Sequence, residues 1–130
     1  MKNKIPYKNQ EKVQKEAFSF LHKLVSKELC VKEAYVWASL AEGTFGIYEE
    51  EYNGRTCSDI DLVIIIDENY PLPKEWKYTT VDKSWFSLYN LGYFHYKNNK
   101  HEIGGLLVFP SKHNLDKMHN ALKGRYKKII

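Results

Sequence analysis

One uninterrupted run of aliphatic residues, at positions 62–66, constrains the fold more than any other feature of this chain. A strand that is apolar on both faces is typical of the middle of a sheet. Residues 58–66 are therefore predicted to form a central strand. A loop is predicted directly after it, because Pro71 and Pro73 within residues 68–74 cannot join an interior ladder.

Helical periodicity marks both ends of the chain. Apolar residues recur every three or four positions over residues 9–30 and again over residues 114–127, so an amphipathic helix is predicted in each segment. The basic residues late in the second segment suit the negative end of a helix dipole. Each helix is expected to pack one face against the rest of the protein.

Shorter elements are predicted between these landmarks. Strands are expected at residues 34–38 and 77–82, and residues 93–109 are typical of a β-hairpin whose turn is Asn98-Asn99. The chain of 130 residues, 43% of them hydrophobic, fits one domain spanning residues 1–130, since domains cluster around ~100–150 residues. The expected fold class is α/β (α+β), with a small mixed β-sheet flanked by helices.

Composition restricts the environment in which the chain is expected to act. Cys30 and Cys57 lie in no Cys-x-x-Cys or Cys/His cluster, so both are predicted to be free thiols in a reducing cytoplasm. The longest apolar run is far shorter than the ~20 residues of a membrane span, and Met1-Lys2-Asn3-Lys4 leads into no apolar signal core. We therefore expect a soluble cytoplasmic protein without a membrane partner.

The net charge is +4, and lysines gather near both ends of the chain. This charge favours a phosphate-bearing partner. A lysine-rich solvated surface is the more common reason for such a composition. Charge alone therefore leaves both interpretations open.

Asp59 and Asp61 lie at the start of the predicted central strand. Side chains two apart in a strand point the same way, so the two carboxylates share a face, with Cα atoms ~6.6–7 Å apart. At ~5 Å separation and an effective dielectric of ~20, their repulsion would be roughly 3 kcal/mol. A divalent cation would relieve it, and Mg²⁺ binds such carboxylates together with phosphate oxygens. An isolated Asp-x-Asp is more often a strand end whose acids face solvent, so the pair needs support from elsewhere.

That support comes from the segment upstream, where a predicted strand ends in Ser39 and is followed by Gly43 and Gly46. A short helix is predicted to follow and to extend to about residue 52, and Asn53-Gly54 is a strong turn signal. Backbone amides in such a turn, with the N-terminus of a helix, form a phosphate-binding cradle. Both glycines are also compatible with ordinary turns.

Two segments carry a resemblance to a known family: Ala38-Ser39-Leu40-Ala41-Glu42-Gly43 and Ser58-Asp59-Ile60-Asp61-Leu62-Val63. They resemble motifs of the DNA polymerase beta-like nucleotidyltransferase superfamily, especially its minimal nucleotidyltransferase members. The resemblance covers residues 35–66, about a quarter of the chain, and implies a nucleotidyltransferase fold. It also implies that Asp59 and Asp61 bind the metal, Mg²⁺ or alternatively Mn²⁺, and that Ser39, Gly43 and Ser58 bind the nucleotide.

The chain departs from the family pattern in three places. Ala38 stands where the family has a glycine before the serine, and the segment before the Asp-x-Asp strand is long. The family's third carboxylate lies on a later strand, and Glu102 is the candidate for this catalytic and metal-binding position. If Gly104 occupies the position instead, the acidic set is incomplete.

Histidines and aromatic residues offer further candidates. His95 and His101 flank the predicted hairpin turn, where a metal or general-base role competes with the more common packing or surface role. Exposed aromatic side chains could stack nucleic-acid bases, whereas core packing is the stronger expectation. The aromatic residues concerned are Trp76, Trp85, Phe86, Tyr89, Tyr93, Phe94 and Tyr96.

Three functions follow as hypotheses. The leading one is a metal-dependent nucleotidyltransferase that moves a nucleoside monophosphate from an NTP to a hydroxyl of a protein, an RNA or a small molecule. Because minimal family members commonly pair with a helical toxin protein, the resemblance implies a protein partner or acceptor. The second hypothesis is an inactive module of the same fold that binds nucleotide or a protein partner. The third is a small basic RNA-binding domain, whose affinity would fall steeply with salt.

Overall fold

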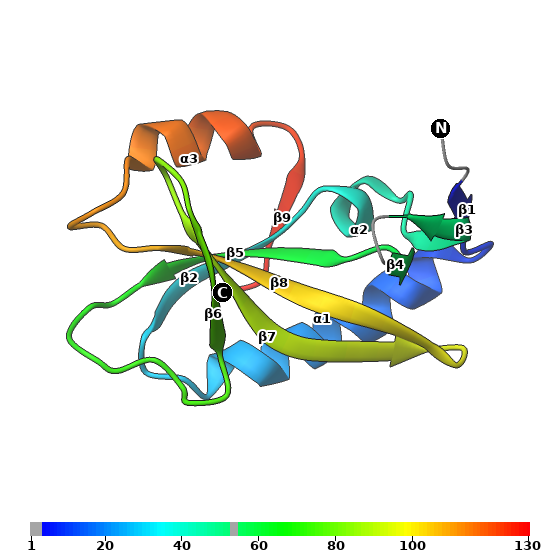
Figure 1. Ribbon diagram of the computed structural model, residues 1–130, viewed down its shortest axis with the longest axis horizontal. Coiled ribbons are helices and arrows are strands. Elements are labelled where there is room, and N and C mark those ends of the chain that lie inside the picture. Colours follow the sequence, from blue (N-terminus) through cyan, green and yellow to red (C-terminus); the bar gives the residue numbers. More distant parts are fainter. Residues whose placement is uncertain (1–3, 53–54) are drawn as a thin grey trace.

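The computed structural model describes residues 4–52 and 55–130, except the side chains of residues 49–52, 55 and 56 (Figure 1). The predicted turn at Asn53-Gly54 lies outside these residues. The described strands form a six-stranded sheet in the order β6-β7-β8-β5-β2-β9 and a three-stranded sheet in the order β1-β3-β4. In chain order, the strands are β1 Lys4–Pro6, β2 Val31–Trp37, β3 Gly46–Tyr52, β4 Arg55–Cys57, β5 Ile60–Ile66, β6 Lys77–Asp82, β7 Ser87–Tyr96, β8 Asn99–Val108 and β9 Tyr126–Lys128.

Strand β5 lies in the interior of the larger sheet, antiparallel to β2 and parallel to β8. Ile60, Leu62 and Ile64 on one face and Val63 on the other are fully buried. Because burial of one such aliphatic side chain contributes about 1.5–3 kcal/mol, this strand is a major source of the stability of the fold. The prediction of a central strand is confirmed for residues 60–66, whereas Ser58 and Asp59 directly precede the strand.

Helix α1, Gln10–Ser26, covers one face of the larger sheet. It begins after Asn9, whose side-chain oxygen accepts a hydrogen bond from the Lys12 N–H at 3.0 Å. Such an N-cap satisfies a backbone donor that the first helical turn leaves unpaired. The buried side chains of α1 pack against alternate residues of β5, and these helix residues are Val13, Ala17, Leu21 and Val25.

Helix α3, Leu115–Leu122, covers part of the other face, where Met118 and Leu122 pack with Val63. The sheet therefore lies between two helices, which confirms the expected mixed α and β class. Within the described part of the chain, no helix combines the length and the apolar character that a membrane span requires.

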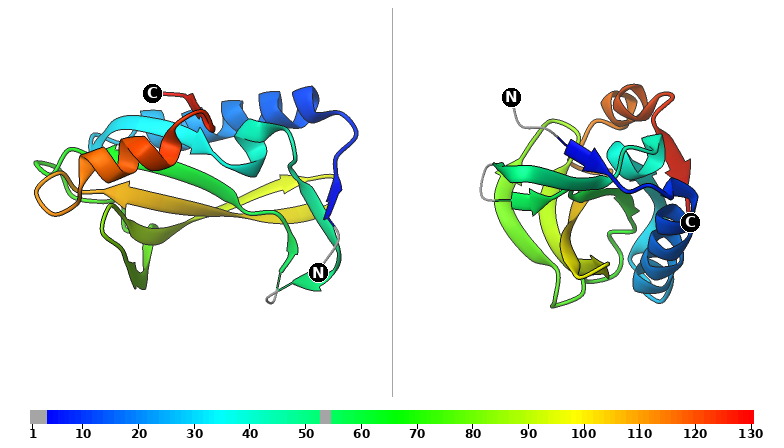
Figure 2. Two further views of the ribbon diagram at one scale, coloured as in Figure 1. Left: turned by 90° about the horizontal axis from the view of Figure 1, so that it is seen from above. Right: turned by 90° about the vertical axis from the view of Figure 1, so that its right-hand side faces the viewer.

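The two ends of β5 differ in how they are covered. In Figures 1 and 2, α3 lies over the half of the larger sheet near the carboxyl end of β5. The smaller sheet lies toward the opposite end of the molecule. The amino end of β5, which Asp59 and Asp61 mark, therefore lies away from α3 and close to the smaller sheet.

Residues 46–52 form strand β3 and not the predicted helix. This strand pairs with β1 on one side and β4 on the other, so tertiary pairing overrides the local preference. Gly46 permits the pairing, because a Cβ atom at this position would lie 2.1 Å from the carbonyl oxygen of Ile5. The short helix α2, Ser39–Glu42, precedes Gly43 instead of following it.

The C-terminal helix ends earlier than predicted. Lys123 leaves the helical conformation with ψ 117°, and Gly124 adopts φ +73°, a left-handed conformation that favours glycine. The chain then reverses and β9 pairs with the edge of β2. The prediction of helix over residues 123–127 is therefore wrong, because two local breaks and strand pairing outweigh the periodicity.

The predicted hairpin is confirmed, although its strands are longer than expected. Strand β7 already begins at Ser87, and the turn lies at Lys97 and Asn98, which adopt φ +47° and +64°. Asn99 belongs to β8 and pairs with Tyr96. The short strand predicted at residues 77–82 is present as the edge strand β6.

Candidate functional site

A polar cavity of about 270 Å³ lies at the amino end of β5. The residues that line it come from β1, β2–α2, β3 and the start of β5, and they are Lys4, Ala38, Ser39, Tyr48, Ser58, Asp59 and Asp61. Four residues singled out from the sequence therefore meet in one place. Both aspartates contribute to the same cavity, as the alternation of a strand predicts.

The turn between β2 and α2 brings Ser39 to this cavity. Ala38 adopts φ 62° and ψ −137°, a conformation that glycine accepts and that a residue with a Cβ atom rarely adopts. The Ala38 carbonyl accepts the N–H of Glu42 at 2.9 Å and so starts the single turn of helix. Gly43 caps this turn in a left-handed conformation, with φ 82°, and is not among the residues that line the cavity.

Replacing Ala38 with glycine is expected to stabilise the protein by about 1 kcal/mol, because a strained φ/ψ costs of order 1–3 kcal/mol and the added chain entropy offsets part of the gain. Urea unfolding monitored by circular dichroism measures this difference. Ala41→Gly in α2, whose backbone is helical, serves as the control and is expected to destabilise. A loss of stability in the Ala38→Gly variant would contradict the assignment of strain.

Ser58 is almost fully buried and lies between β4 and β5, where it bonds to the first residue of β3. Its N–H donates to the Gly46 carbonyl at 2.9 Å, and its hydroxyl oxygen accepts the Gly46 N–H at 3.3 Å. The side chain therefore already has a structural partner. Its contribution to the cavity is to hold the backbone from which Asp59 and Asp61 project.

His101 supports the backbone at Ser58 through a hydrogen bond of its own. It is fully buried, its Nδ1 lies 2.7 Å from the Ser58 carbonyl oxygen, and its Nε2 lies 2.7 Å from the Tyr7 hydroxyl. Because a carbonyl only accepts, Nδ1 carries the proton and Nε2 accepts from Tyr7. Burial lowers the pKa of His101 below its usual 6.5, although the bond to Ser58 opposes this shift. His101 is thus a neutral structural residue.

This burial predicts a pH-dependent stability. Below about pH 6.5 the unfolded chain takes up a proton that folded His101 resists, so the free energy of unfolding falls, by up to ~1.4 kcal/mol per pH unit, until the folded-state pKa is reached. Urea unfolding between pH 7.5 and 5 measures the slope. The His101→Gln variant should be less stable at pH 7.5 and have a flatter profile. The exposed His22→Gln variant should keep the wild-type slope; equal slopes in all three proteins would contradict the assignment.

The strand register defines the surroundings of Asp61. Trp37 of β2 pairs with Asp61, Asp61 pairs with Gly104 of β8, and Gly104 pairs with Asn90 of β7. A Cβ atom on Gly104 would lie 3.9 Å from Asp61 Oδ1 and no closer than 3.6 Å to the other atoms around it. The position on β8 directly beside Asp61 is therefore occupied by a residue without a side chain, and it has room for one.

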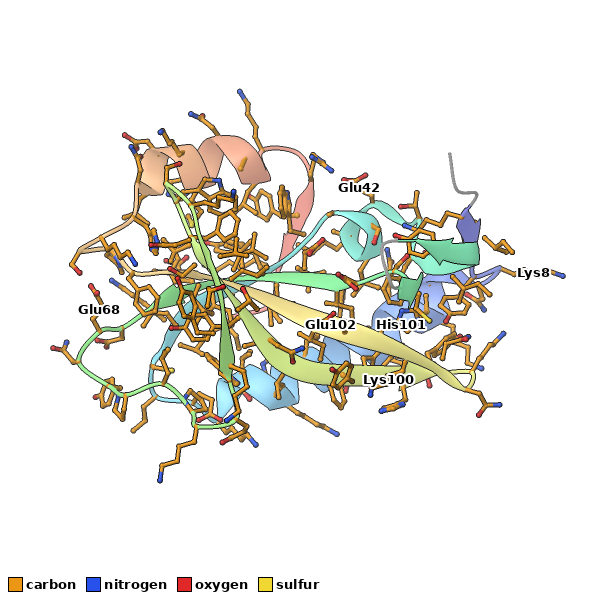
Figure 3. All side chains as sticks on the ribbon, viewed as in Figure 1. Lys8, Glu42, Glu68, Lys100, His101 and Glu102 are labelled. Atoms are coloured by element: carbon orange, nitrogen blue, oxygen red, sulfur yellow. The ribbon has the colours of Figure 1, made fainter. Side chains whose placement is uncertain are left out.

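Glu102 lies on β8 two residues before Gly104 and faces the same side of the sheet as Gly104. Figure 3 labels it beside His101. Its Oε1 accepts a hydrogen bond from Asn90 Nδ2 at 2.6 Å. Glu102 is not among the residues that line the cavity. Among the described residues, no group of three or more His, Cys, Asp or Glu side chains is arranged to hold a metal ion.

Lys4 and Tyr48 line the cavity although sequence reasoning did not select them. They are paired residues of β1 and β3. Burial, the largest influence, lowers the pKa of the Lys4 ammonium, whereas the carboxylates of Glu42 and Asp61 raise it. In the sequence, Lys4 is only one of several lysines near the N-terminus. No local pattern distinguishes it, because its position depends on strand pairing across more than 40 residues.

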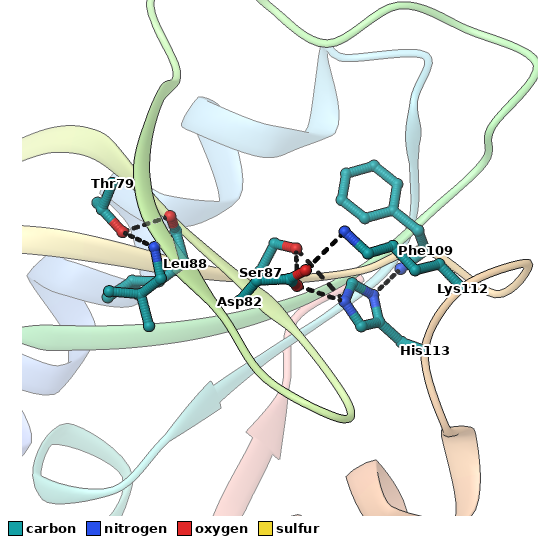
Figure 4. Close-up of polar contacts among 8 residues, drawn as sticks. Thr79, Asp82, Ser87, Leu88, Phe109, Lys112 and His113 are labelled. Carbon is teal, nitrogen blue, oxygen red and sulfur yellow. Dashed lines mark hydrogen bonds and ion pairs between the residues drawn. The ribbon is translucent and has the colours of Figure 1, made fainter.

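A second polar cluster joins β6, β7 and the loop before α3 (Figure 4). Asp82 accepts from the Ser87 hydroxyl at 2.7 Å and from Lys112 Nζ at 2.8 Å, and His113 Nε2 lies 3.2 Å away. Lys112, together with Ser87 and His113, holds the pKa of Asp82 well below its usual range. His113 Nδ1 accepts the Phe109 N–H. The Ser87 proton therefore points to Asp82 and not to a free histidine nitrogen. The cluster thus joins these elements structurally and contains no activated nucleophile.

The histidine and aromatic candidates fall into a buried group and an exposed group. Phe94 pairs with His101 and shares its buried face, whereas His95 is exposed, so the two histidines do not form one site. Trp76, Phe94 and Tyr96 belong to the core, as expected, while Tyr93 is 40% exposed. Trp85 packs edge-on against Trp37 at 5.9 Å between ring centroids.

The cavity thus combines two carboxylates, a serine hydroxyl and an ammonium. Hard oxygen donors of this kind suit a divalent cation together with phosphate oxygens. Protein-family models, curated protein sequences and solved structures were each compared with the chain, and none matches it.

Proposed function

We propose that the cavity binds a divalent metal ion together with the phosphates of an NTP, and that the protein transfers the nucleoside monophosphate to an acceptor hydroxyl. The observation that carries the proposal is the meeting of Ser39, Asp59 and Asp61 in one cavity, although they come from two separate segments. The order of β2, Ser39, a short helix and then an Asp-x-Asp strand supports the nucleotidyltransferase fold that the sequence resemblance implies.

The donor set fits one Mg²⁺ or Mn²⁺ ion. Asp59 and Asp61 would supply the one or two protein carboxylates that Mg²⁺ commonly takes alongside phosphate oxygens and water. Bound there, the ion would neutralise charge on the phosphates. The cavity of about 270 Å³ is slightly smaller than the ~300–1,000 Å³ of typical ligand pockets. It would therefore enclose the triphosphate and leave the base outside.

In the proposed reaction, the acceptor hydroxyl gives up its proton to solvent, and its oxygen forms a bond to the α-phosphorus of the NTP. The bond from that phosphorus to the oxygen bridging to the β-phosphate breaks, and pyrophosphate leaves. Ser39 would hold phosphate oxygens through its hydroxyl. Glu102 is the candidate third carboxylate on β8, and it would exchange its bond to Asn90 to complete the acidic set. Catalysis would rest on positioning and charge neutralisation.

A second candidate function is nucleotide binding without turnover, and Gly104 favours it. Gly104 pairs with Asp61 on the strand that would supply the third carboxylate. With a glycine there and Glu102 bonded to Asn90, the metal would have two protein carboxylates. A protein of this kind would bind the metal and the NTP, and the bond between the α- and β-phosphates would stay intact.

Incubation with an NTP labelled on its α-phosphate distinguishes the two functions. The protein is mixed with Mg²⁺ or Mn²⁺ and cell extract, and label is followed in protein, RNA and small-molecule fractions. Transfer that is lost in the Asp59→Asn/Asp61→Asn variant supports the transferase. Metal-dependent binding of label without transfer supports the binding module. Absence of both binding and transfer contradicts both functions.

A further inference from the structure

Several independent contacts fix strand β1 and the residues after it, and this strand carries Lys4 to the cavity. Gly46 lets β1 approach β3 so closely that any side chain at position 46 would meet the Ile5 backbone. Directly after β1, the Tyr7 N–H donates to the Phe45 carbonyl at 2.9 Å. The Gln10 side chain donates to both the Tyr7 and the Phe45 carbonyls, at 2.7 and 2.8 Å. Lys4 is therefore presented by a strand that is tied to the body of the protein.

The surroundings of Lys4 are acidic. Its ammonium lies in the field of Asp61 and of Glu42, and it lines the same cavity as Asp59 and Asp61. Among the lining residues that the structure describes, Lys4 is the cation. A partly desolvated ammonium beside carboxylates has two possible counterions: the carboxylates while no metal is bound, and an added anion once a metal has neutralised them.

We propose that Lys4 binds the phosphate groups of the nucleotide, in the same cavity as the carboxylates that would hold the metal. This inference rests on the proposed function and adds a residue, from the N-terminal strand, that the serine and Asp-x-Asp segments do not include. A lysine is suited to this role because its ammonium is a compact charge with three donors for phosphate oxygens.

The role predicts effects of opposite sign on two ligands. Removal of the ammonium takes away an attraction for phosphate, so binding of a metal–polyphosphate complex weakens. The same removal takes away a positive charge near Asp61, so binding of the metal alone tightens. A purely structural role of Lys4 would weaken binding of both ligands, because both depend on the shape of the cavity.

Isothermal titration with Mn²⁺ alone, and with Mn²⁺ and inorganic tripolyphosphate, tests the proposal. Relative to wild type, Lys4→Met is expected to raise the Kd for Mn²⁺–tripolyphosphate about tenfold or more, the loss typical of a hydrogen bond to a charged group. Its Kd for Mn²⁺ alone should fall. Lys4→Arg should stay near the wild-type values. Lys8→Met is the matched control, because Lys8 points away from the protein (Figure 3).

Several results would overturn the proposal. One is a Lys4→Met protein that binds Mn²⁺–tripolyphosphate as tightly as wild type. Others are equal weakening of both ligands in Lys4→Met, and a Lys4→Arg variant as weak as Lys4→Met. Circular dichroism and thermal unfolding confirm that each variant is folded. If wild type binds Mn²⁺–tripolyphosphate and Lys4→Met has the same Kd, only the inference on Lys4 fails. If wild type binds neither ligand, the proposed function fails with it.

Discussion

Replacing Asp61 with asparagine is expected to abolish the stabilisation that Mg²⁺ and an NTP together give the wild-type protein. Asparagine keeps the shape of the side chain but removes the charge that a metal ion requires. A ligand at 100 times its Kd raises the free energy of unfolding by ≈ 2.7 kcal/mol, so a loss of affinity of about 100-fold or more removes nearly all of this gain. Thermal unfolding with and without metal and NTP measures it.

Asp59→Asn should give the same result, because both carboxylates line the cavity. Asp116→Asn is the control, since Asp116 is exposed in the first turn of α3, on a different part of the protein. Its response to metal and NTP should match that of wild type. If Asp61→Asn and Asp59→Asn also respond like wild type, the metal and nucleotide do not bind where we propose.

Replacing Gly104 with aspartate is expected to convert the cavity into a stronger metal site. The backbone of Gly104 lies outside the left-handed region, and a Cβ atom there makes only ordinary contacts, so the substitution is sterically allowed. Without metal, a third carboxylate at ~5 Å from Asp61 costs roughly 3 kcal/mol at an effective dielectric of ~20. The variant should therefore unfold at a lower temperature without metal, and metal should restore its stability.

Titration with Mn²⁺ should give a Kd at least ~10-fold lower for Gly104→Asp than for wild type, because a bound cation relieves a repulsion of more than 1.4 kcal/mol. Gly104→Asn is the matched control, since it has the same size without the charge, and it should bind Mn²⁺ like wild type. Equal Kd values for the aspartate and asparagine variants would show that position 104 does not face the metal site.

The same variant distinguishes the two candidate functions. If wild type binds nucleotide without transfer and Gly104→Asp transfers label, the missing carboxylate accounts for the lack of turnover. If wild type already transfers label and Glu102→Gln abolishes the transfer, Glu102 completes the acidic set. In the second case Gly104→Asp adds little to the rate, because the set is already complete.

Several parts of the fold that local pattern determines were predicted correctly. The aliphatic run after Asp61 predicted a buried central strand, and alternation predicted that Asp59 and Asp61 share a face; both residues line one cavity. The periodicity of residues 9–30 predicted helix α1. These predictions succeed because burial and side-chain direction follow directly from a period of two or of 3.6 residues.

The parts that depend on distant pairing were not predictable. Residues 46–52 become a strand because β1 and β4 lie on either side, and Lys4 reaches the cavity through that same pairing. The choice between Glu102 and Gly104 depends on the register of β8 against β5, because the two residues share a face and a shift of two residues would place Glu102 beside Asp61 instead of Gly104. A single sequence contains no local signal for that register.

The backbone conformation of Ala38 bears on the sequence resemblance. The family pattern has glycine at this position, and Ala38 adopts the positive φ that glycine accepts more readily. The backbone at Ala38 thus adopts a glycine-type turn although the residue is alanine. Strain of this kind persists where the surroundings determine the conformation, which is common at binding sites.

Amide NMR spectroscopy with Mn²⁺ and a non-hydrolysable NTP analogue tests the central proposal most directly, because the paramagnetic ion broadens the resonances of residues close to it. At low ratios of Mn²⁺ to protein, we predict selective broadening of Ser39, Asp59, Asp61 and Gly104, enhanced by the nucleotide analogue. Uniform broadening, or broadening centred on Asp82, would contradict a metal–nucleotide site at the amino end of β5.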